Sequence, residues 1–299
     1  MTSVSASPPS GSGPAFELPA ELGIDTDVAR RIIDGFITSQ LRQAGFSRAV
    51  VGLSGGIDSA LVAHLVAEAI GADSLLCVLM PYSGSSADSR TDAAAVVDQL
   101  GCASTLVDIS PMVDAYFADG APGGREASPV RRGNFMARMR MAVLYDHSVT
   151  FGGLVAGTGN KTEMLIGYTT LFGDSACAFA PIGDLYKSQV RQLAAVMGVP
   201  DAIVRKSPSA DLWPGQTDEG ELGVSYADLD RLLFWMIDKR RAPDELIELG
   251  FDDGLVERVG RMVARSEFKR QVAPIAKLGP RTVGIDYLYP RRRPGSARR

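Results

Sequence analysis

Two serines and an aspartate surround a pair of glycines between Ser54 and Ser59, where the chain reads Ser-Gly-Gly-Ile-Asp-Ser. Glycines let a ligand approach the backbone closely, and the backbone N–H groups of such a turn can bind an anion. The two serine hydroxyls supply further donors. Asp58 would repel a phosphate, but it can hold a cation that bridges to the phosphate. The stretch therefore predicts a phosphate site that uses a metal ion.

The flanking residues predict a strand before this stretch and a helix after it. Residues 49–53 form a short apolar run with β-branched valines, which is typical of a buried parallel strand. From Asp58 onward, apolar residues recur at helical spacing. Such a strand–turn–helix unit aims the helix N-terminus at a ligand of the turn. The simpler alternative is that the serines and the aspartate only cap the helix, although a cap does not need two glycines and two serines together.

A second polar stretch, Gly157-Thr158-Gly159-Asn160-Lys161-Thr162-Glu163, follows another predicted strand. Ligands of doubly wound sheets bind at the carboxyl ends of the strands, so this stretch is expected near the first one. Glu163 is a candidate partner for Asp58, because Mg²⁺ at a nucleotide is usually held by one or two carboxylates and phosphate oxygens. The alternative is that Glu163 only occupies the first turn of a helix, where the helix dipole favours an acid.

The order of elements predicts the fold class. Strands alternating with helices indicate an α/β fold with a doubly wound parallel sheet and ligands at the strands' carboxyl ends. After Val199 only helices are predicted, which gives the sheet a helical C-terminal extension. The predicted strands are 49–53, 74–80, 104–109 and 153–157, with a short piece at 179–182; the predicted helices are 25–44, 58 onward, 85–100, 131–147, 187–197, 226–239, 243–249 and 253–270.

The remaining segments are predicted to be loops and tails. Residues 118–129 are rich in Gly and Pro, and a loop is expected from 157 through 174. The long segment 206–223 contains Trp213 and several acids, which suits a lid that closes over the site. The predicted boundaries are a disordered tail at 1–14, one domain at 15–275, and an extension with a basic tail at 276–299.

Composition excludes several classes of protein. The chain has 299 residues, 45% of them hydrophobic, and a net charge of -4, which argues against a dedicated nucleic-acid binder. No apolar run is long enough for a membrane span, and the N-terminus has no secretory signal pattern. The three cysteines are scattered and form no C-x-x-C motif, so disulfides and zinc are not expected. A cytoplasmic protein without a nucleic-acid or membrane partner is the prediction.

The loop at 54–59 resembles the S-G-G-x-D-S loop of ATP pyrophosphatases, which split ATP between the α- and β-phosphates. Further motifs follow the order and spacing of the NAD synthetase family from about residue 25 to 270. No glutaminase domain precedes them, so the chain resembles the ammonia-using form. These motifs are Gly133-Asn134-x-x-Ala137-Arg138-x-Arg140-Met141, Gly157 to Glu163, Pro181 to Lys187, Pro208 to Glu219 and Ser266-Glu267-x-Lys269-Arg270.

The resemblance implies a reaction and a role for each matching residue. The family adenylylates a carboxylate, releases pyrophosphate and lets ammonia form the amide, and it is homodimeric with the acid near the dimer interface. ATP is the co-substrate and Mg²⁺ the cofactor. The implied residues are Gly52, Leu53, Ser54, Gly55, Gly56, Ile57, Asp58, Ser59, Thr158, Lys187 and Ser209 for ATP; Asp58 and Glu163 for Mg²⁺; Arg138, Asp174 and Lys269 for the acid substrate; and Asp58, Glu163 and Lys187 for catalysis.

Three positions differ from the family pattern. Leu171, Ala178 and Phe268 stand where the family has a lysine, an aspartate and a histidine that contact deamido-NAD. A site built for charged groups loses affinity without them, so two substrates are considered: deamido-NAD, and a different carboxylic acid. Two further alternatives share the loop. A tRNA-thiolating enzyme would need catalytic or zinc-binding cysteines and a basic face, and a non-catalytic nucleotide-binding module would not need Asp58, Glu163 and Lys187 together.

Overall fold

A four-stranded parallel sheet forms one half of the protein, as the sequence predicts. The computed structural model describes residues 18–120, 122, 127–209 and 216–286. The strands are β1 (Ala49–Gly52), β2 (Leu75–Leu79), β3 (Ala103–Leu106) and β4 (Leu154–Ala156), in the order β3-β2-β1-β4. The order reverses at β1, since β2 lies on one side of it and β4 on the other. In doubly wound sheets such a switch point marks the ligand crevice.

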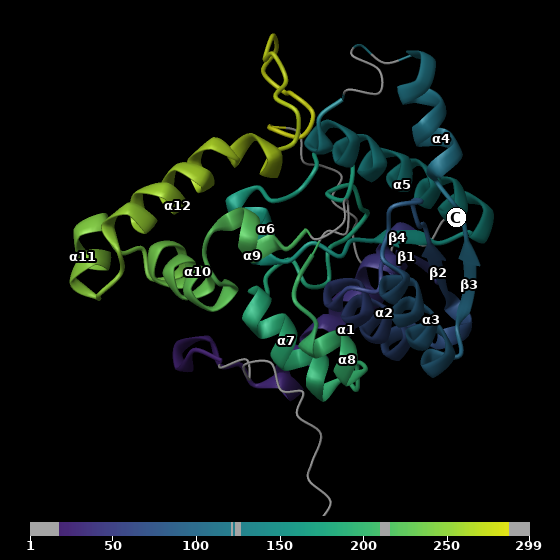
Figure 1. Ribbon diagram of the computed structural model, residues 1–299, viewed down its shortest axis with the longest axis horizontal. Coiled ribbons are helices and arrows are strands. Elements are labelled where there is room, and N and C mark those ends of the chain that lie inside the picture. Colours follow the sequence, from purple (N-terminus) through teal and green to yellow (C-terminus); the bar gives the residue numbers. More distant parts are fainter. Residues whose placement is uncertain (1–17, 121, 123–126, 210–215, 287–299) are drawn as a thin grey trace, which may run out of the picture.

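Alternate residues of the two central strands point into separate cores. Val51 and Cys77 pack in one core with helices α1 (Thr26–Ala44), α2 (Ile57–Ile70), α3 (Ala87–Leu100) and α7 (Lys187–Val196). Val50 and Val78 pack in the other with α4 (Ser110–Ala115) and α5 (Pro129–Phe151). Figure 1 shows these helices around the sheet. Because both faces of the sheet are covered at its centre, β2 is apolar and buried at every residue and not at alternate ones.

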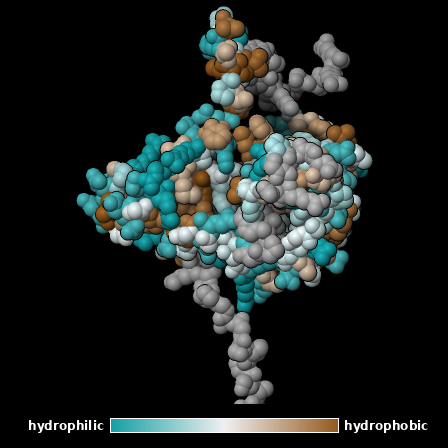
Figure 2. All heavy atoms as spheres, turned by 45° about the horizontal axis from the view of Figure 1, so that its top comes forward, coloured by the Kyte–Doolittle hydropathy of each residue, from teal (hydrophilic) through white to brown (hydrophobic). Residues whose placement is uncertain are grey.

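The C-terminal helices form their own core at the other end of the molecule. α10 (Tyr226–Leu233), α11 (Pro243–Glu248) and α12 (Asp253–Arg265) pack together and against α6 (Lys161–Ile166), away from the sheet (Figure 1). This confirms the predicted helical extension. Beyond the turn Glu267–Arg270, residues 271–286 project from the body with Val272 and Leu278 exposed (Figures 1 and 2).

Local sequence signals fix where the main helices begin and end. Asp25 caps α1 by accepting a hydrogen bond from the backbone N–H of Val28, and α1 ends at Gly45 in the left-handed conformation. Ser86 caps α3, which ends at the left-handed Gly101. These short-range signals explain why most of the predicted boundaries lie within a few residues of the structure.

Several sequence-based predictions about helices are wrong. The predicted loop 157–174 contains α6, and helices α4, α8 (Asp201–Arg205) and α9 (Asp218–Leu222) were not predicted. Each is six residues or fewer, too short for a helical period to stand out. The predicted loop at 118–129 overlaps a π-helical turn at Tyr116–Gly120 and the start of α5.

Two predicted long helices are also shorter than expected. The helix predicted at 226–239 changes into a π-helical turn, Phe234–Asp238, after Leu233. The helix predicted at 253–270 ends at Arg265 and continues as a 3₁₀ turn. The termini at 1–14 and 291–299 and the lid residue Trp213 lie outside the described residues, and the domain boundaries remain predictions. No described helix combines the length and the apolar character that crossing a membrane requires.

Candidate active site

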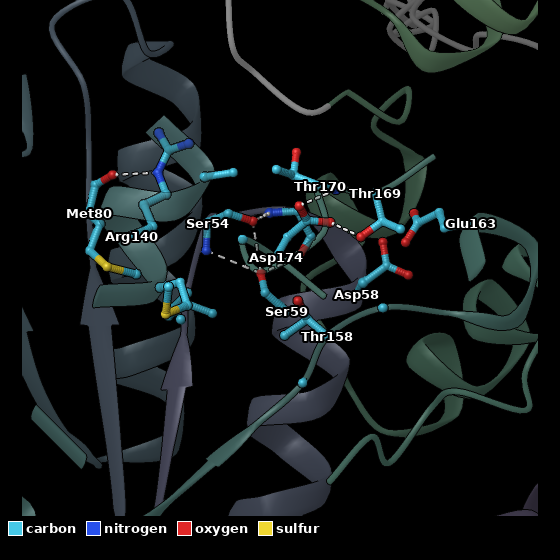
Figure 3. Close-up of a pocket in the computed structure, with 18 of the residues that line it drawn as sticks. Ser54, Asp58, Ser59, Met80, Arg140, Thr158, Glu163, Thr169, Thr170 and Asp174 are labelled. Atoms are coloured by element: carbon cyan, nitrogen blue, oxygen red, sulfur yellow. Dashed lines mark hydrogen bonds between the residues drawn. The ribbon is translucent and has the colours of Figure 1, made fainter. Parts of the chain in front are cut away.

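A cavity of about 560 Å³ opens at the carboxyl ends of β1 and β4. It lies where the strand order reverses, as the fold class predicts. Both polar stretches singled out in the sequence line it, together with residues of α3, α5, α7 and the chain after α6. Figure 3 shows Ser54 and Ser59 near its middle, Met80 and Arg140 on one side, and Asp58 and Glu163 on the other.

The loop after β1 is held in shape by its two serines. Ser59 Oγ lies 3.1 Å from Ser54 Oγ and donates to the carbonyl of Gly56 at 3.0 Å. The backbone N–H of Gly56 donates to Ser54 Oγ at 3.2 Å. Gly56 is the N-cap of α2, and no side chain caps this N-terminus. The first turn of α2 therefore presents the positive end of a helix dipole to the cavity.

Gly55 has a structural reason to be glycine. Its φ of +82° lies in the left-handed region, and a Cβ there would lie 2.1 Å from the carbonyl oxygen of Ser89 in α3. Ile57, two residues further on and the first residue of α2, is buried in the core. Neither Gly55 nor Ile57 is among the residues that line the cavity. Gly55 thus shapes the loop, and Ile57 anchors it.

The loop after β4 brings a second carboxylate to the same place. Asn160 caps α6 by accepting from the backbone N–H of Glu163 at 3.0 Å, and Glu163 accepts in return from the backbone N–H of Asn160 at 3.4 Å. The side-chain amide of Asn160 also donates to Asp58 Oδ1 at 2.9 Å. Glu163 is therefore both a first-turn residue of a helix and a cavity residue, so the two sequence interpretations are compatible.

Lys187, the first residue of α7, joins the two carboxylates. Its ammonium lies 2.5 Å from Asp58 Oδ2 and 3.1 Å from Glu163 Oε1. The Lys187 side chain is 4% exposed, against 16% for Asp58 and 18% for Glu163. The three side chains come from three different elements, and all three line the cavity.

Burial and charge set the protonation of this group. Burial raises the pKa of Glu163 to about 7, although Lys187 pulls in the opposite direction. Burial also opposes the charge on Lys187, but the carboxylates of Asp58 and Glu163 outweigh it and raise the pKa of the ammonium. Lys187 is therefore a permanent cation, whereas Glu163 titrates near neutral pH.

Further polar residues at this end of the cavity were not singled out from the sequence. The hydroxyl of Tyr168 donates to Glu221 at 2.6 Å and to Asp218 at 3.2 Å, and that of Tyr226 donates to Asp218 at 3.1 Å. Burial raises the pKa of Asp218. Asp218 lies in the Pro208–Glu219 motif, whereas the link between Tyr168 and Glu221 arises only when the chain after α6 meets α9.

The residues predicted to bind the acid substrate are only partly brought together. Asp174 lines the cavity and accepts from Thr169 Oγ1 at 2.6 Å. Lys269 also lines it, and its ammonium donates to the carbonyls of Gly167 and Thr169, both at 2.7 Å. Arg138 is not in the lining; its guanidinium donates to the carbonyl of Leu171 at 3.2 Å.

The three positions that differ from the family pattern lie outside the described lining of the cavity. Leu171, Ala178 and Phe268 are all absent from it, and Phe268 is 61% exposed. Of the other predicted site residues, the lining contains Gly52, Leu53, Ser54, Gly56, Asp58, Ser59, Thr158, Glu163, Lys187 and Ser209.

The arrangement suits chemistry on a phosphate ester. The loop and the N-terminus of α2 favour an anion, and Lys187 supplies a fixed positive charge beside them. Asp58 and Glu163 offer hard oxygen ligands that converge on one point, now held by the Lys187 ammonium. Among the described residues no group of three or more His, Cys, Asp or Glu side chains is placed to hold a metal ion.

Comparison with known proteins agrees with this geometry. Residues 29–273 match the NAD synthase family. The chain is 49% identical over 272 residues to the NH₃-dependent NAD⁺ synthetase of Trichlorobacter lovleyi, covering 91% of this chain and 98% of that protein. Among solved structures it is similar to the NMN synthetase of Francisella tularensis (TM-score 0.75, 30% identity, 85% and 99% of the two chains). It is similar also to the NH₃-dependent NAD synthetase of Campylobacter jejuni (TM-score 0.73, 30% identity, 85% and 100%).

Proposed function

The chain belongs to the NAD synthase family, and we propose that it converts deamido-NAD to NAD with ATP and ammonia, releasing AMP and pyrophosphate. The observation that carries this proposal is the convergence of Lys187, Asp58 and Glu163 beside the Ser54–Ser59 loop. When ATP and a carboxylate bind together there, the site can activate the carboxylate for attack by ammonia, which is the reaction of a carbon–nitrogen ligase. The 49% identity to an NH₃-dependent NAD⁺ synthetase supports that substrate pair.

The cavity offers a different environment to each part of ATP. Near the end of β2 it is lined by apolar side chains, including Met80, Met141 and Leu144, which suit the adenine ring. The loop of Ser54 and Ser59 suits the phosphates. The acid substrate would enter on the side of Asp174 and Lys269, so that its carboxylate faces the α-phosphate.

Lys187 carries the central role in the proposed mechanism. A carboxylate oxygen of the acid attacks the α-phosphorus of ATP, and the bond to the β-phosphate oxygen breaks to release pyrophosphate. Lys187 offsets the negative charge that develops on the phosphate oxygens during this step. Ammonia then attacks the acyl carbon, the bond to AMP breaks, and a proton leaves the new amide nitrogen.

Mg²⁺ fits the donor set of the site. Asp58 and Glu163 are oxygen ligands within reach of one point, and Mg²⁺ commonly takes one or two carboxylates plus phosphate oxygens. Asp58 and Glu163 would hold it, and when bound it would neutralise charge on the leaving pyrophosphate. Lys187 would offset further negative charge on the phosphates.

A second acid is a candidate substrate. The similarity to an NMN synthetase favours nicotinate mononucleotide as an alternative substrate. A different acid, suggested by Leu171, Ala178 and Phe268, has less support because these positions lie outside the cavity lining of this chain. Deamido-NAD remains the proposed substrate, since the curated relative at 49% identity is an NH₃-dependent NAD⁺ synthetase.

A cytoplasmic homodimer is also part of the proposal. Apolar side chains on α5 are exposed in the single chain, with Val149 83% and Val130 63% exposed. A second copy would cover such residues. Light scattering during gel filtration should give twice the chain mass, and Val149→Glu should shift it toward the monomer; a wild-type monomer at micromolar concentration contradicts the dimer.

The experiment for the function is an end-point assay with two acids. Purified protein is incubated with ATP, Mg²⁺ and ammonium, and with either deamido-NAD or nicotinate mononucleotide, and the products are identified by mass. We expect NAD, AMP and pyrophosphate in equal amounts, with a higher kcat/KM for deamido-NAD. Preference for nicotinate mononucleotide would favour the second candidate, and no amide from either acid would contradict both. Asp58→Asn is the inactive control.

A further inference from the structure

Asp230 is a charged residue buried in an otherwise apolar part of the molecule. It lies on α10, is 0% exposed and is not in the cavity lining. Its neighbours Leu229, Leu232 and Leu233 are buried in the core of the C-terminal helices. A buried carboxylate is costly, and an apolar side chain of similar volume is often neutral or better for stability. The presence of an acid at this position therefore calls for a reason other than packing.

The carboxylate of Asp230 accepts hydrogen bonds from two residues that stand beside the catalytic candidates. Thr162 Oγ1 donates to Asp230 Oδ1 at 2.5 Å. The backbone N–H and the hydroxyl of Ser188 donate to Asp230 Oδ2 at 2.7 and 2.6 Å. Thr162 precedes Glu163 in α6, and Ser188 follows Lys187 in α7. One side chain thus joins the starts of both helices that carry the ion pair.

A further hydrogen bond closes this connection. Thr162 Oγ1 accepts from the backbone N–H of Lys187 at 3.0 Å. Because the hydroxyl proton of Thr162 is committed to Asp230, its lone pair is turned toward Lys187. The backbone of Lys187 is therefore held relative to α6 through Thr162, and that of Ser188 directly by Asp230. These bonds connect the backbones of the two helices that carry Glu163 and Lys187.

We propose that Asp230 is a positioning residue that sets the distance between Lys187 and Glu163 for the adenylylation step. The inference rests on the proposed function, since it assigns a role within that reaction. Only an ionised carboxylate accepts from all three donors at once. In an asparagine, the side-chain NH₂ would face either Thr162 Oγ1 or Ser188, where a donor already points. Asp230→Asn therefore keeps the volume but loses the alignment.

The test separates alignment from stability by comparing two buried positions of the same helix. Asp230→Asn and the control Leu232→Ala are assayed by ATP–pyrophosphate exchange with deamido-NAD, with rates divided by the folded fraction. Leu232 is 0% exposed, packs in the core of the C-terminal helices and is not among the residues that line the cavity. We expect Asp230→Asn to lower kcat at least about tenfold, with the KM for ATP within about threefold, because small misplacements of catalytic groups carry a large rate cost. Leu232→Ala should keep the wild-type kcat.

A double-mutant cycle tests the route through Thr162. Thr162→Val alone should also lower kcat at constant KM, and combining it with Asp230→Asn should cost much less than the product of the two single effects. If Asp230→Asn is not recovered folded, Thr162→Val carries the test. A wild-type kcat in either folded variant, or independent multiplicative effects, would overturn the proposal.

The same assay keeps this inference distinct from the proposed function. Wild-type protein without exchange activity on deamido-NAD or nicotinate mononucleotide would contradict the function itself. Active wild-type protein with an equally active Asp230→Asn would leave the function standing and overturn only the role of Asp230.

Discussion

The ammonium of Lys187 lies 2.5 Å from a carboxylate oxygen of Asp58, although the two residues are 129 positions apart in the sequence. Asp58 is in the first turn of α2 and Lys187 opens α7. A lysine at a helix N-terminus opposes the helix dipole, so the local sequence does not favour it there. The position is explained by what Lys187 faces: two carboxylates and a loop suited to phosphate.

Replacing Lys187 tests its role directly. Lys187→Met leaves Asp58 and Glu163 buried without their shared cation, so we expect a loss of stability of about 3 kcal/mol. Exchange activity should fall at least about 100-fold, because the charge beside the phosphates is gone. The control is Lys277→Met, whose partner Asp286 is partly exposed and whose loss should cost less than about 1 kcal/mol. Wild-type exchange by Lys187→Met would refute the role of this lysine.

Two glycines with nearly equal φ allow the cost of backbone strain to be measured apart from the cost of a steric clash. Gly55 and Gly45 have φ of +82° and +81°, but a Cβ at Gly55 would lie 2.1 Å from the Ser89 carbonyl oxygen, whereas Gly45 has nothing within 4 Å. Gly45→Ala should cost about 1–2 kcal/mol from the left-handed backbone alone. Gly55→Ala should cost more and raise the KM for ATP, as measured by urea denaturation and exchange kinetics. Equal effects at the two positions would mean that the loop has room to shift.

The raised pKa of Glu163 predicts a pH-dependent affinity for Mg²⁺. Burial raises this pKa to about 7, so Glu163 is largely neutral at pH 6 and largely ionised at pH 8. Only the ionised form is a good ligand, and the Mg²⁺ concentration for half-maximal exchange should fall about tenfold over this range. Glu163→Gln should bind Mg²⁺ weakly and lose this dependence, apart from the titration of ATP itself. If the Mg²⁺ concentration for half-maximal exchange depended on pH in the same way in the variant, the titrating group would be one other than Glu163.

Lys269 is expected to affect the acid substrate and not ATP. Its ammonium holds the carbonyls of Gly167 and Thr169 at the cavity wall and is the predicted contact for the substrate carboxylate. Lys269→Met should raise the KM for deamido-NAD about tenfold or more and leave the KM for ATP unchanged. Arg265→Met, an exposed cation near the end of α12, is the control. An unchanged KM for the acid would limit Lys269 to supporting the loop.

Much of the fold follows from patterns that are local in the sequence. The valines of β1, the helical period of α2 and the capping residues Asp25 and Ser86 each act within a few positions. The alternation of strands and helices then restricts the sheet to a few possible parallel topologies. The short helices were missed because six residues or fewer are too few to show a helical period. In α6 a tertiary contact adds to the local capping of Asn160 and Glu163, since the Asn160 amide also donates to Asp58.

The site residues that follow a predicted strand could be identified from the sequence. The contacts that depend on the packing of several helices could not. Asp58 and Glu163 could be paired because both follow parallel strands that end at one edge of the sheet. The ion pairs that Lys187 forms with Asp58 and Glu163 depend on how α7 packs on α2. No local sequence pattern predicts that packing. The same holds for Asp230, whose partners lie 68 and 42 residues away in the sequence.

Adenylylation is tested most directly by following the carboxylate oxygen atoms of the acid substrate into the products. Deamido-NAD labelled with ¹⁸O in its nicotinate carboxylate is converted with ATP and ammonia, and the products are examined by mass spectrometry. Because the carboxylate oxygen attacks the α-phosphorus and stays with it when ammonia displaces AMP, one labelled oxygen should appear in AMP and none in pyrophosphate. Label in pyrophosphate or inorganic phosphate, or unlabelled AMP beside the amide product, would contradict adenylylation at this site.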